Sequence, residues 1–296
     1  MKTKISLIGV PMDLGQIHRG VDGGPAALRN AGIITKLQSL NYEIIDLGDI
    51  PIERPLQIEK SGKLKNLEPV IAVNEKLAKA VDAEVIKERF PLIMGGDHSI
   101  AIGSLAGISK HYKNLGVIWF DAHGDLNTSE TTLSGNIHGM PLAVSLGLGH
   151  ERLTNLYNYV PKVKTENIVI VGVHSLDPGE EELIHKKRIK VYTMYDIEHI
   201  GISRVMAETI RYLKEKTDGV HLSLDLDFLD PVEAPGVGVS VLGGMQFDEG
   251  RIAMAMLSES NLITSFEVVE LNPVFDKENK TARLAVGLIE SLFDKK

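Results

Sequence analysis

Short apolar runs alternate with longer amphipathic stretches along the whole chain. Eight runs rich in β-branched residues predict strands at positions 5–10, 43–47, 91–94, 117–120, 168–173, 190–193, 220–224 and 263–269. Several of these runs are apolar at every position, as in Val117-Ile118-Trp119-Phe120. Strands that are covered on both faces have this pattern, so it favours a parallel sheet.

Helical spacing of apolar residues separates many of the predicted strands. Positions 67–86 place their apolar residues near one helical face, and 203–216, 249–259 and 280–293 follow the same pattern. Strand–helix alternation over the full length predicts an α/β fold with a doubly wound parallel sheet. A chain of 296 residues leaves room for two domains, but the unbroken alternation leads us to expect one domain, 1–296.

Two stretches fit neither pattern. Positions 48–66 are polar and irregular and predict a long surface excursion, whereas 124–140 are rich in Gly, Ser, Thr and Asn. A loop of the second kind, long and without its own secondary structure, is usually functional in a compact domain.

The composition excludes several classes of site. Hydrophobic residues make up 43% of the chain and charged residues 24%, which is the balance of a globular protein. The chain has no cysteine, so disulfides, a thiolate nucleophile and Cys-based zinc or iron–sulfur sites are excluded.

Charge and hydropathy limit the partners. The net charge is −8 and no basic stripe is present, so we expect no nucleic-acid partner. No apolar run reaches about 18 residues, so we expect no membrane partner. The first apolar run is too short for a signal peptide and ends at Pro11-Met12-Asp13. We therefore expect a cytoplasmic protein.

Acidic residues and histidines follow four of the predicted strands. Ligands bind beyond the carboxyl ends of strands in open parallel sheets. The segments at these ends are Gly95-Gly96-Asp97-His98, Asp121-Ala122-His123-Gly124-Asp125, Asp225-Leu226-Asp227-Phe228-Leu229-Asp230-Pro231 and Glu270-Leu271-Asn272-Pro273. Six other histidines lie outside these segments and are expected to be surface or packing residues: His18, His111, His150, His185, His199 and His221.

The spacing within these segments allows the side chains to converge. Alternate residues of an extended chain point the same way, so Asp121, His123 and Asp125 can meet at one point, as can Asp225 and Asp227. Such acids would repel one another unless a cation compensated them. With His98 there are four carboxylate and two imidazole ligands, a thiolate-free set that suits two divalent ions and favours Mn²⁺.

Three of these motifs together resemble the signatures of the ureohydrolase family, whose members hydrolyse guanidino compounds at a binuclear manganese centre. The resemblance covers essentially the whole chain. It implies a three-layer α/β/α fold of the arginase/deacetylase type, with a parallel sheet of about eight strands.

One further segment resembles arginases in particular. The stretch 125–128 and the stretch 134–141 are similar to the arginase loop that receives the substrate α-carboxylate, and 175–180 is similar to the segment that receives the α-amino group. Neutral donors suit a carboxylate, and acidic side chains suit an ammonium group. The substrate-binding residues expected on this basis are Asn127, Thr132, Ser134, Asn136, Asp177 and Glu180.

The resemblance also implies roles at the reacting centre. One Mn²⁺ would be held by His98, Asp121, Asp125 and Asp225, and the other by Asp121, His123, Asp225 and Asp227. His138 would carry the proton to the leaving amine, and Glu270 would pair with the guanidinium. The expected reaction is hydrolysis of L-arginine to L-ornithine and urea by a metal-bridging hydroxide. The likeness also implies a homo-oligomer, a hexamer.

The sequence departs from the arginase pattern at Val239-Ser240, where arginases usually have Thr-Pro. The change removes a hydroxyl expected near Glu270. Two alternatives stay open: another ureohydrolase, acting on agmatine or a guanidino acid, and, because of this departure, a catalytically weak metal-binding regulator.

Overall fold

A computed structural model describes residues 3–57 and 62–295 of the chain. Positions 58–61 of the expected 48–66 excursion lie outside the described residues. The strands are β1 Lys4–Val10, β2 Glu43–Asp49, β3 Phe90–Gly95, β4 Leu115–Phe120, β5 Ile168–Val173, β6 Lys190–Thr193, β7 Gly219–Asp225 and β8 Ile263–Val269. The helices are α1 Gly24–Asn30, α2 Ile33–Ser39, α3 Leu67–Ile86, α4 Ala101–Ser109, α5 Pro141–Ser145, α6 Glu151–Thr154, α7 Pro178–Lys187, α8 Met194–Ile200, α9 Ile202–Lys214, α10 Phe247–Ser260 and α11 Lys280–Phe293.

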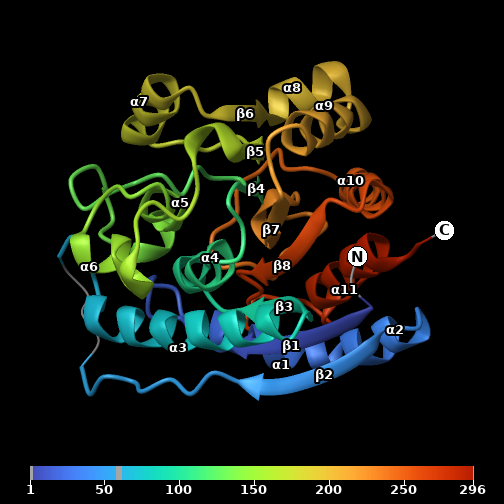
Figure 1. Cartoon of the computed structure of the whole chain (residues 1–296), viewed down its shortest axis with the longest axis horizontal. Coiled ribbons are helices and arrows are strands. Elements are labelled where there is room, and N and C mark those ends of the chain that lie inside the picture. The colour runs from blue at the N-terminus through green and yellow to red at the C-terminus, as the bar shows by residue number, and fades with distance from the viewer. Residues whose placement is uncertain (1–2, 58–61, 296) are drawn as a thin grey trace.

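The eight strands form one parallel sheet in the order β2-β1-β3-β8-β7-β4-β5-β6. Figure 1 shows β2 and β6 at its two edges. The central strands β3, β4 and β7 are buried at every position, whereas β2 is exposed or half-buried throughout. This difference explains why β3 and β4 read as unbroken apolar runs. The equally buried β7 carries His221 and Ser223 among its apolar residues.

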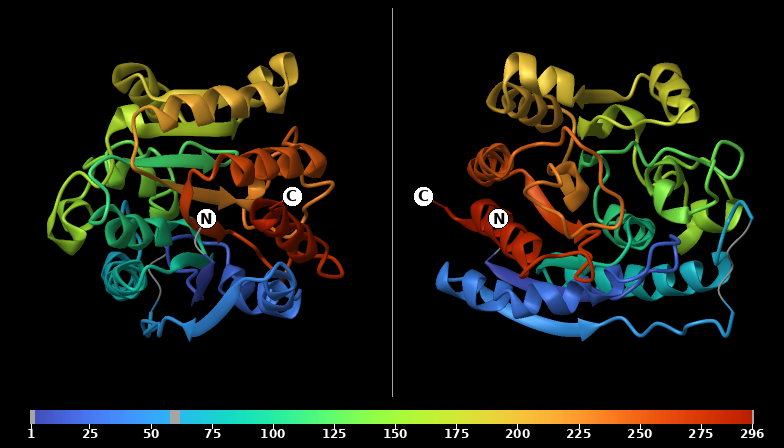
Figure 2. Two further views of the ribbon diagram at one scale, coloured as in Figure 1. Left: turned by 45° about the vertical axis from the view of Figure 1, so that its right-hand side comes forward. Right: turned by 180° about the vertical axis from the view of Figure 1, so that it is seen from behind.

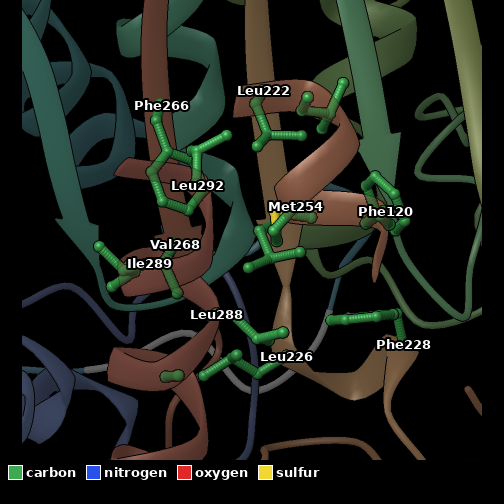
Figure 3. Close-up of a cluster of buried hydrophobic side chains, with 14 of the residues drawn as sticks. Phe120, Leu222, Leu226, Phe228, Met254, Phe266, Val268, Leu288, Ile289 and Leu292 are labelled. Carbon is green, nitrogen blue, oxygen red and sulfur yellow. The ribbon is translucent and has the colours of Figure 1, made fainter. Parts of the chain in front are cut away.

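Helices cover both faces of the sheet, which confirms the expected three layers (Figures 1 and 2). One core packs α3, α4 and α5 against Ile93, Val117 and Trp119. The other core packs α9, α10 and α11 against side chains on the opposite face of the sheet, including Phe120 of β4 and Leu222 of β7. Figure 3 shows part of this second core, where side chains of α10 and α11 meet those of β7 and β8.

A glycine lets the segment after β3 approach the segment after β1. A Cβ atom at Gly96 would lie 1.8 Å from the carbonyl oxygen of Met12, so only glycine fits there. The backbone N–H of Asp97 donates to that same carbonyl oxygen at 2.8 Å. This close approach fixes the start of the 3-10 turn His98–Ile100, which carries the first of the expected metal ligands.

Candidate active site

The candidate site lies where the central strands β3, β8, β7 and β4 end. His98 follows β3, Glu270 follows β8, Asp225 ends β7 and Asp121 follows β4. Neighbouring parallel strands end at the same edge of a sheet, so these residues meet there. The pocket at this edge is lined by His98, His123, Asp125, Asn127, Ser134, His138, Gly139, Ser175, Asp177, Glu180, Asp225, Asp227, Val239 and Glu270.

His98 lies at the centre of a first group of possible metal ligands. Its Nδ1 atom lies 3.1 Å from Asp121 Oδ2 and 3.1 Å from Asp225 Oδ2. Asp125 Oδ2 lies 3.0 Å from the same nitrogen. The ligand atoms of His98, Asp121 and Asp225 lie within 4.8 Å of one another, close enough to hold one ion.

A second group shares Asp121 with the first. His123 Nδ1 lies 3.3 Å from Asp121 Oδ1 and 3.1 Å from Asp227 Oδ2. These three residues also offer ligand atoms within 4.8 Å of one another. The two groups use different oxygens of Asp121, so this carboxylate can join two ions.

The buried polar atoms of this cluster fit a pair of cations. His98 Nδ1 and Asp125 Oδ2 are buried and have no hydrogen-bond partner among the described residues. Burial is the main reason that the pKa of Asp225 is raised well above its ordinary value and that of Asp125 is raised to about 6. Carboxylates that are this difficult to ionise, with unpaired lone pairs pointing at an imidazole nitrogen, match the donor set of hard or borderline divalent ions.

The backbone arranges these ligands through short local hydrogen bonds. Asp121 Oδ1 accepts from the N–H of His123 at 2.7 Å, and Asp225 Oδ1 accepts from that of Asp227 at 2.9 Å. Asp125 has a left-handed backbone with φ 51°, and Glu270 has one with φ 64°. These conformations are unfavourable for residues other than glycine and cluster at functional sites.

Trp119 supports two of the metal-site residues from within β4. Its Nε1–H donates to Asp121 Oδ2 at 3.0 Å. Its ring stacks on that of His98, with centroids 4.2 Å apart and planes 7° apart. Sequence analysis missed this role because an apolar run hides a tryptophan; its place two residues before Asp121 was the available signal.

His138 and Glu270 form a pair beside the metal-site residues. His138 Nδ1 lies 3.0 Å from Glu270 Oε1. Burial opposes the charged form of each group, but their mutual hydrogen bond and the attraction of nearby charges together outweigh it, so the pKa of His138 is raised and that of Glu270 is lowered. Glu270 also accepts from the backbone N–H of His98 at 2.9 Å and from Gln16 Nε2 at 2.7 Å. Sequence analysis did not identify Gln16, which lies far from the metal motifs along the chain.

The polar loop is attached to the start of α7 at the opening of the pocket. Asn127 Nδ2 donates to Asp177 Oδ2 at 2.8 Å. Glu180 accepts backbone N–H groups from Leu126 at 2.9 Å and from Asp177 at 2.9 Å. Burial raises the pKa of Glu180 to about 7. Both oxygens of Glu180 thus hold the backbone that carries Asn127 and Asp177.

Three of the expected site residues do not line the pocket. Asp121 is fully buried beneath it. Thr132 Oγ1 accepts the N–H of Gly135 at 2.9 Å, and Asn136 Oδ1 accepts from Lys65 Nζ at 3.2 Å. Thr132 and Asn136 thus serve the loop itself in this structure, and their contact with a substrate stays a prediction.

No helix in the ranges 3–57 and 62–295 combines the length and the apolar character that crossing a membrane requires.

Comparisons with known proteins agree with this geometry. The Arginase family model matches residues 3–294. The chain is 60% identical over 294 residues to an arginase of Bacillus caldovelox, covering 99% of this chain and 98% of that one. It is 58% identical to an arginase of Bacillus subtilis (strain 168), covering 100% of this chain and 99% of that one.

Solved structures give the same result. The native structure of the Bacillus caldovelox arginase superposes with a TM-score of 0.96, covering 99% of this chain and 98% of that one. An Entamoeba histolytica arginase in complex with L-ornithine is 33% identical and superposes with a TM-score of 0.92, covering 98% of each chain. Sequence, fold and the arrangement of the site thus agree, and the chain belongs to the arginase family.

Proposed function

We propose that the protein is an arginase that hydrolyses L-arginine with one water molecule to L-ornithine and urea. The observation that carries this proposal is the pair of ligand groups joined by Asp121, beside the His138–Glu270 pair and below the loop at Asn127. The high identity to arginases over the full chain supports the same reaction.

We further propose that two Mn²⁺ ions per subunit occupy the site. His98, Asp121, Asp125 and Asp225 would hold one ion, and Asp121, His123, Asp225 and Asp227 the other. A pair of divalent cations, when bound, lowers the pKa of water enough to supply a nucleophile at neutral pH. Asp225 would be the second shared carboxylate, and its Oδ2 lies 3.1 Å from His98 Nδ1.

Glu270 and His138 would act at the guanidinium end of the substrate. The Glu270 carboxylate would accept hydrogen bonds from the guanidinium, which holds the carbon over the metal site. His138 keeps Nδ1 toward Glu270 at 3.0 Å, and we assign proton delivery to the leaving amine to Nε2. Imidazole suits this task because it gains and loses a proton near neutral pH.

The amino-acid end of arginine would meet the loop and α7. Asn127 and Ser134 line the pocket and offer uncharged donors to the α-carboxylate, whereas Asp177 offers negative charge to the α-amino group. We propose that Thr132 and Asn136 contribute by shaping this loop and Glu180 by holding its start. This arrangement would distinguish arginine from agmatine, which lacks the carboxylate.

The test is kcat/KM for L-arginine and for agmatine on Mn²⁺-loaded protein. Agmatine would leave loop donors unpaired, at roughly 1–3 kcal/mol for each group. Two such groups correspond to a preference for arginine on the order of a hundredfold. Equal use of both compounds would move the assignment to another ureohydrolase, and no urea from either would favour the regulator.

Val239 sharpens this test because it lines the pocket beside Glu270 rather than on the loop. We expect Val239→Thr to raise the rates on both compounds by a similar factor of a few, since one added hydroxyl contributes about 1 kcal/mol. Val232→Thr, at an exposed position outside the pocket, is the matched control. A large change in the arginine-to-agmatine ratio would contradict this placement of Val239.

Three further properties are proposed on the family likeness. We propose that residues 1–296 form one catalytic domain, that the protein assembles into a homohexamer, and that it works in the cytoplasm. A single cooperative unfolding transition, a sedimentation mass six times that of the 32.4 kDa chain, and cell fractionation check these statements.

A further inference from the structure

A line of polar side chains is buried in the sheet behind His98. His221, Ser223 and Glu267 are each 0% exposed. Alternate residues of a strand face the same side, so His221 and Ser223 of β7 share the face that ends in Asp225. The strand register places Ser223 beside Glu267 of β8. A carboxylate is almost never fully buried unless it is paired with other polar groups. The arginase reaction as proposed does not use Glu267.

The contacts form a continuous series of polar interactions that ends at a metal-site residue. His98 Nε2 lies 2.8 Å from Ser223 Oγ. The Ser223 hydroxyl donates to Glu267 Oε1 at 2.8 Å. His221 Nε2 lies 3.2 Å from the same carboxylate oxygen, and His221 Nδ1 lies 3.0 Å from Ser265 Oγ.

The chemistry of these groups determines which atom donates and which accepts in each of these interactions. An ionised carboxylate can only accept hydrogen bonds. Burial raises the pKa of Glu267, but the attraction of His221 together with that of further nearby groups outweighs burial, so the pKa is lowered. The hydroxyl of Ser223 must then donate to Glu267, which leaves its lone pairs to accept from His98 Nε2–H. A neutral imidazole that is protonated at Nε2 has its free lone pair at Nδ1.

Nδ1 is the atom that the metal site requires. It faces Asp125 Oδ2 at 3.0 Å and the oxygens of the two other acids at 3.1 Å. We propose that Glu267, acting through Ser223, is a positioning residue that holds His98 in the tautomer able to bind a metal ion through Nδ1. This inference rests on the metal site of the proposed function and adds the residue that prepares one ligand.

Glu267→Gln separates this role from simple packing because it keeps the shape of the side chain. The amide group can donate as well as accept, so Ser223 is no longer forced to donate to it. When the amide donates, Ser223 can donate to His98 Nε2, which leaves the ring proton on Nδ1. Loss of a partner behind a metal ligand typically costs 10- to 100-fold in metal affinity.

The chain provides a matched control at another buried Ser–Glu pair. Ser6 Oγ donates to Glu84 Oε2 at 2.6 Å, and Glu84 is 2% exposed. Ser6 lies on β1 and Glu84 on α3, neither of which carries a metal-site residue. Glu84→Gln therefore makes the same chemical change at a buried carboxylate that contacts the sheet from α3, without touching His98.

The experiment is Mn²⁺ titration of metal-free wild type, Glu267→Gln, Ser223→Ala, the double variant and Glu84→Gln, by equilibrium dialysis with elemental analysis. Electron paramagnetic resonance distinguishes coupled ion pairs from single ions. We expect Glu267→Gln to weaken one of two positions roughly 10- to 100-fold and to show single-ion signals at Mn²⁺ levels that fill the wild type. The effects of the two single changes should not add in the double variant, because both act through one hydroxyl.

Three results would overturn the inference: wild-type affinity at both positions in Glu267→Gln, additive effects in the double variant, or equal weakening by Glu84→Gln. If Glu267→Gln does not fold, Ser223→Ala alone decides, since it too should weaken a single position and wild-type binding would refute the role. No arginine enters this measurement. An inactive wild type that binds two ions would therefore refute the proposed reaction but not this inference.

Discussion

The floor and the rim of the pocket are held in different ways. The floor consists of His98, Asp121, Asp225 and Asp227 at the ends of β3, β4 and β7, and all four are buried. The rim is the loop 127–136, in which Leu133 is 80% exposed. Strand register places the floor, whereas hydrogen bonds within the loop and to α7 place the rim.

This contrast separates two consequences of substitution. A change on the floor disturbs the packing between strands and the charge balance of a buried cluster, so it should affect folding and metal binding together. Residues 128–134 of the rim are half-buried or exposed, so a change among them should affect the choice of substrate and leave the fold intact. Four predictions test this division.

The largest effect is expected for Asp121→Asn, because Asp121 belongs to both ligand groups. Loss of its charge should weaken both metal positions and lower activity by more than the roughly 10- to 100-fold typical of an indirect partner. Elemental analysis with a urea assay measures this. Asp46→Asn, in a surface pair with Arg29, is the control. Two full Mn²⁺ ions and normal turnover in Asp121→Asn would refute the assignment.

His98 and His123 should contribute differently to the stability of the fold. The side chain of His98 is 1% exposed and stacks on Trp119, whereas that of His123 is 26% exposed. His98→Ala leaves a cavity and uncompensated buried acids, so we expect it to lower the unfolding free energy of metal-free protein by about 2–5 kcal/mol. His123→Ala should cost under about 1 kcal/mol. Urea denaturation measures both, and equal losses would contradict the comparison.

Asp125 predicts a pH dependence of the metal-free protein. Burial and the nearby Asp121 raise its pKa to about 6, against about 4 in the unfolded chain. The folded state thus holds the proton more tightly, so the contribution of Asp125 to stability is full below about pH 4 and is lost as pH rises through about 6. Asp125→Asn should remove on the order of 2 kcal/mol from the fall in unfolding free energy over this pH range.

Urea denaturation between about pH 4 and pH 7 measures that slope. Asp46 is the control with opposite sign, because its hydrogen bond to Arg29 lowers its pKa. Its contribution should persist across this window and be lost only as pH falls below about 4. An unchanged slope in Asp125→Asn would show that other buried groups of the site cause the pH dependence.

The smallest effect is expected on the rim. Ser134 lines the pocket and is exposed. Ser134→Ala removes one donor, so kcat/KM for arginine should fall by a factor of about 5–10, or about 1 kcal/mol, with unchanged stability and metal content. Rates on agmatine should change little. Ser129→Ala, in the same loop but outside the pocket lining, is the control. A loss of stability in Ser134→Ala would contradict the division between rim and floor.

Much of the fold could be predicted because its core is layered. The predicted strands 168–173, 190–193 and 263–269 and the helices 67–86 and 280–293 agree with the observed bounds of β5, β6, β8, α3 and α11. By contrast, α4 was not predicted, because all nine of its residues are buried and no polar face gives a helical period. In α7 the capping box of Asp177 and Glu180 was a readable signal, but Glu180 was interpreted only as a substrate contact.

The site could be predicted where its residues share short motifs. The three metal motifs lie at strand ends, and chain direction alone brings them to one edge. The supporting residues could not be found in this way, since Gln16, Ser223 and Glu267 act across strands that are distant in sequence. The alternation of His221, Ser223 and Asp225 in an apolar strand was a usable signal, because polar groups on one buried face must have partners.

At Asp125 and Glu270, which have left-handed backbones, the residue that is best for stability differs from the residue that the site needs. Glycine at either position would relax the backbone, by roughly 1 kcal/mol or more in a conformation of this kind. Each such change would remove a functional carboxylate at the same time. A screen that selects for stability alone would therefore favour variants that are more stable but bind no metal and have no activity. Attempts to make this chain more heat-resistant should leave these two positions fixed.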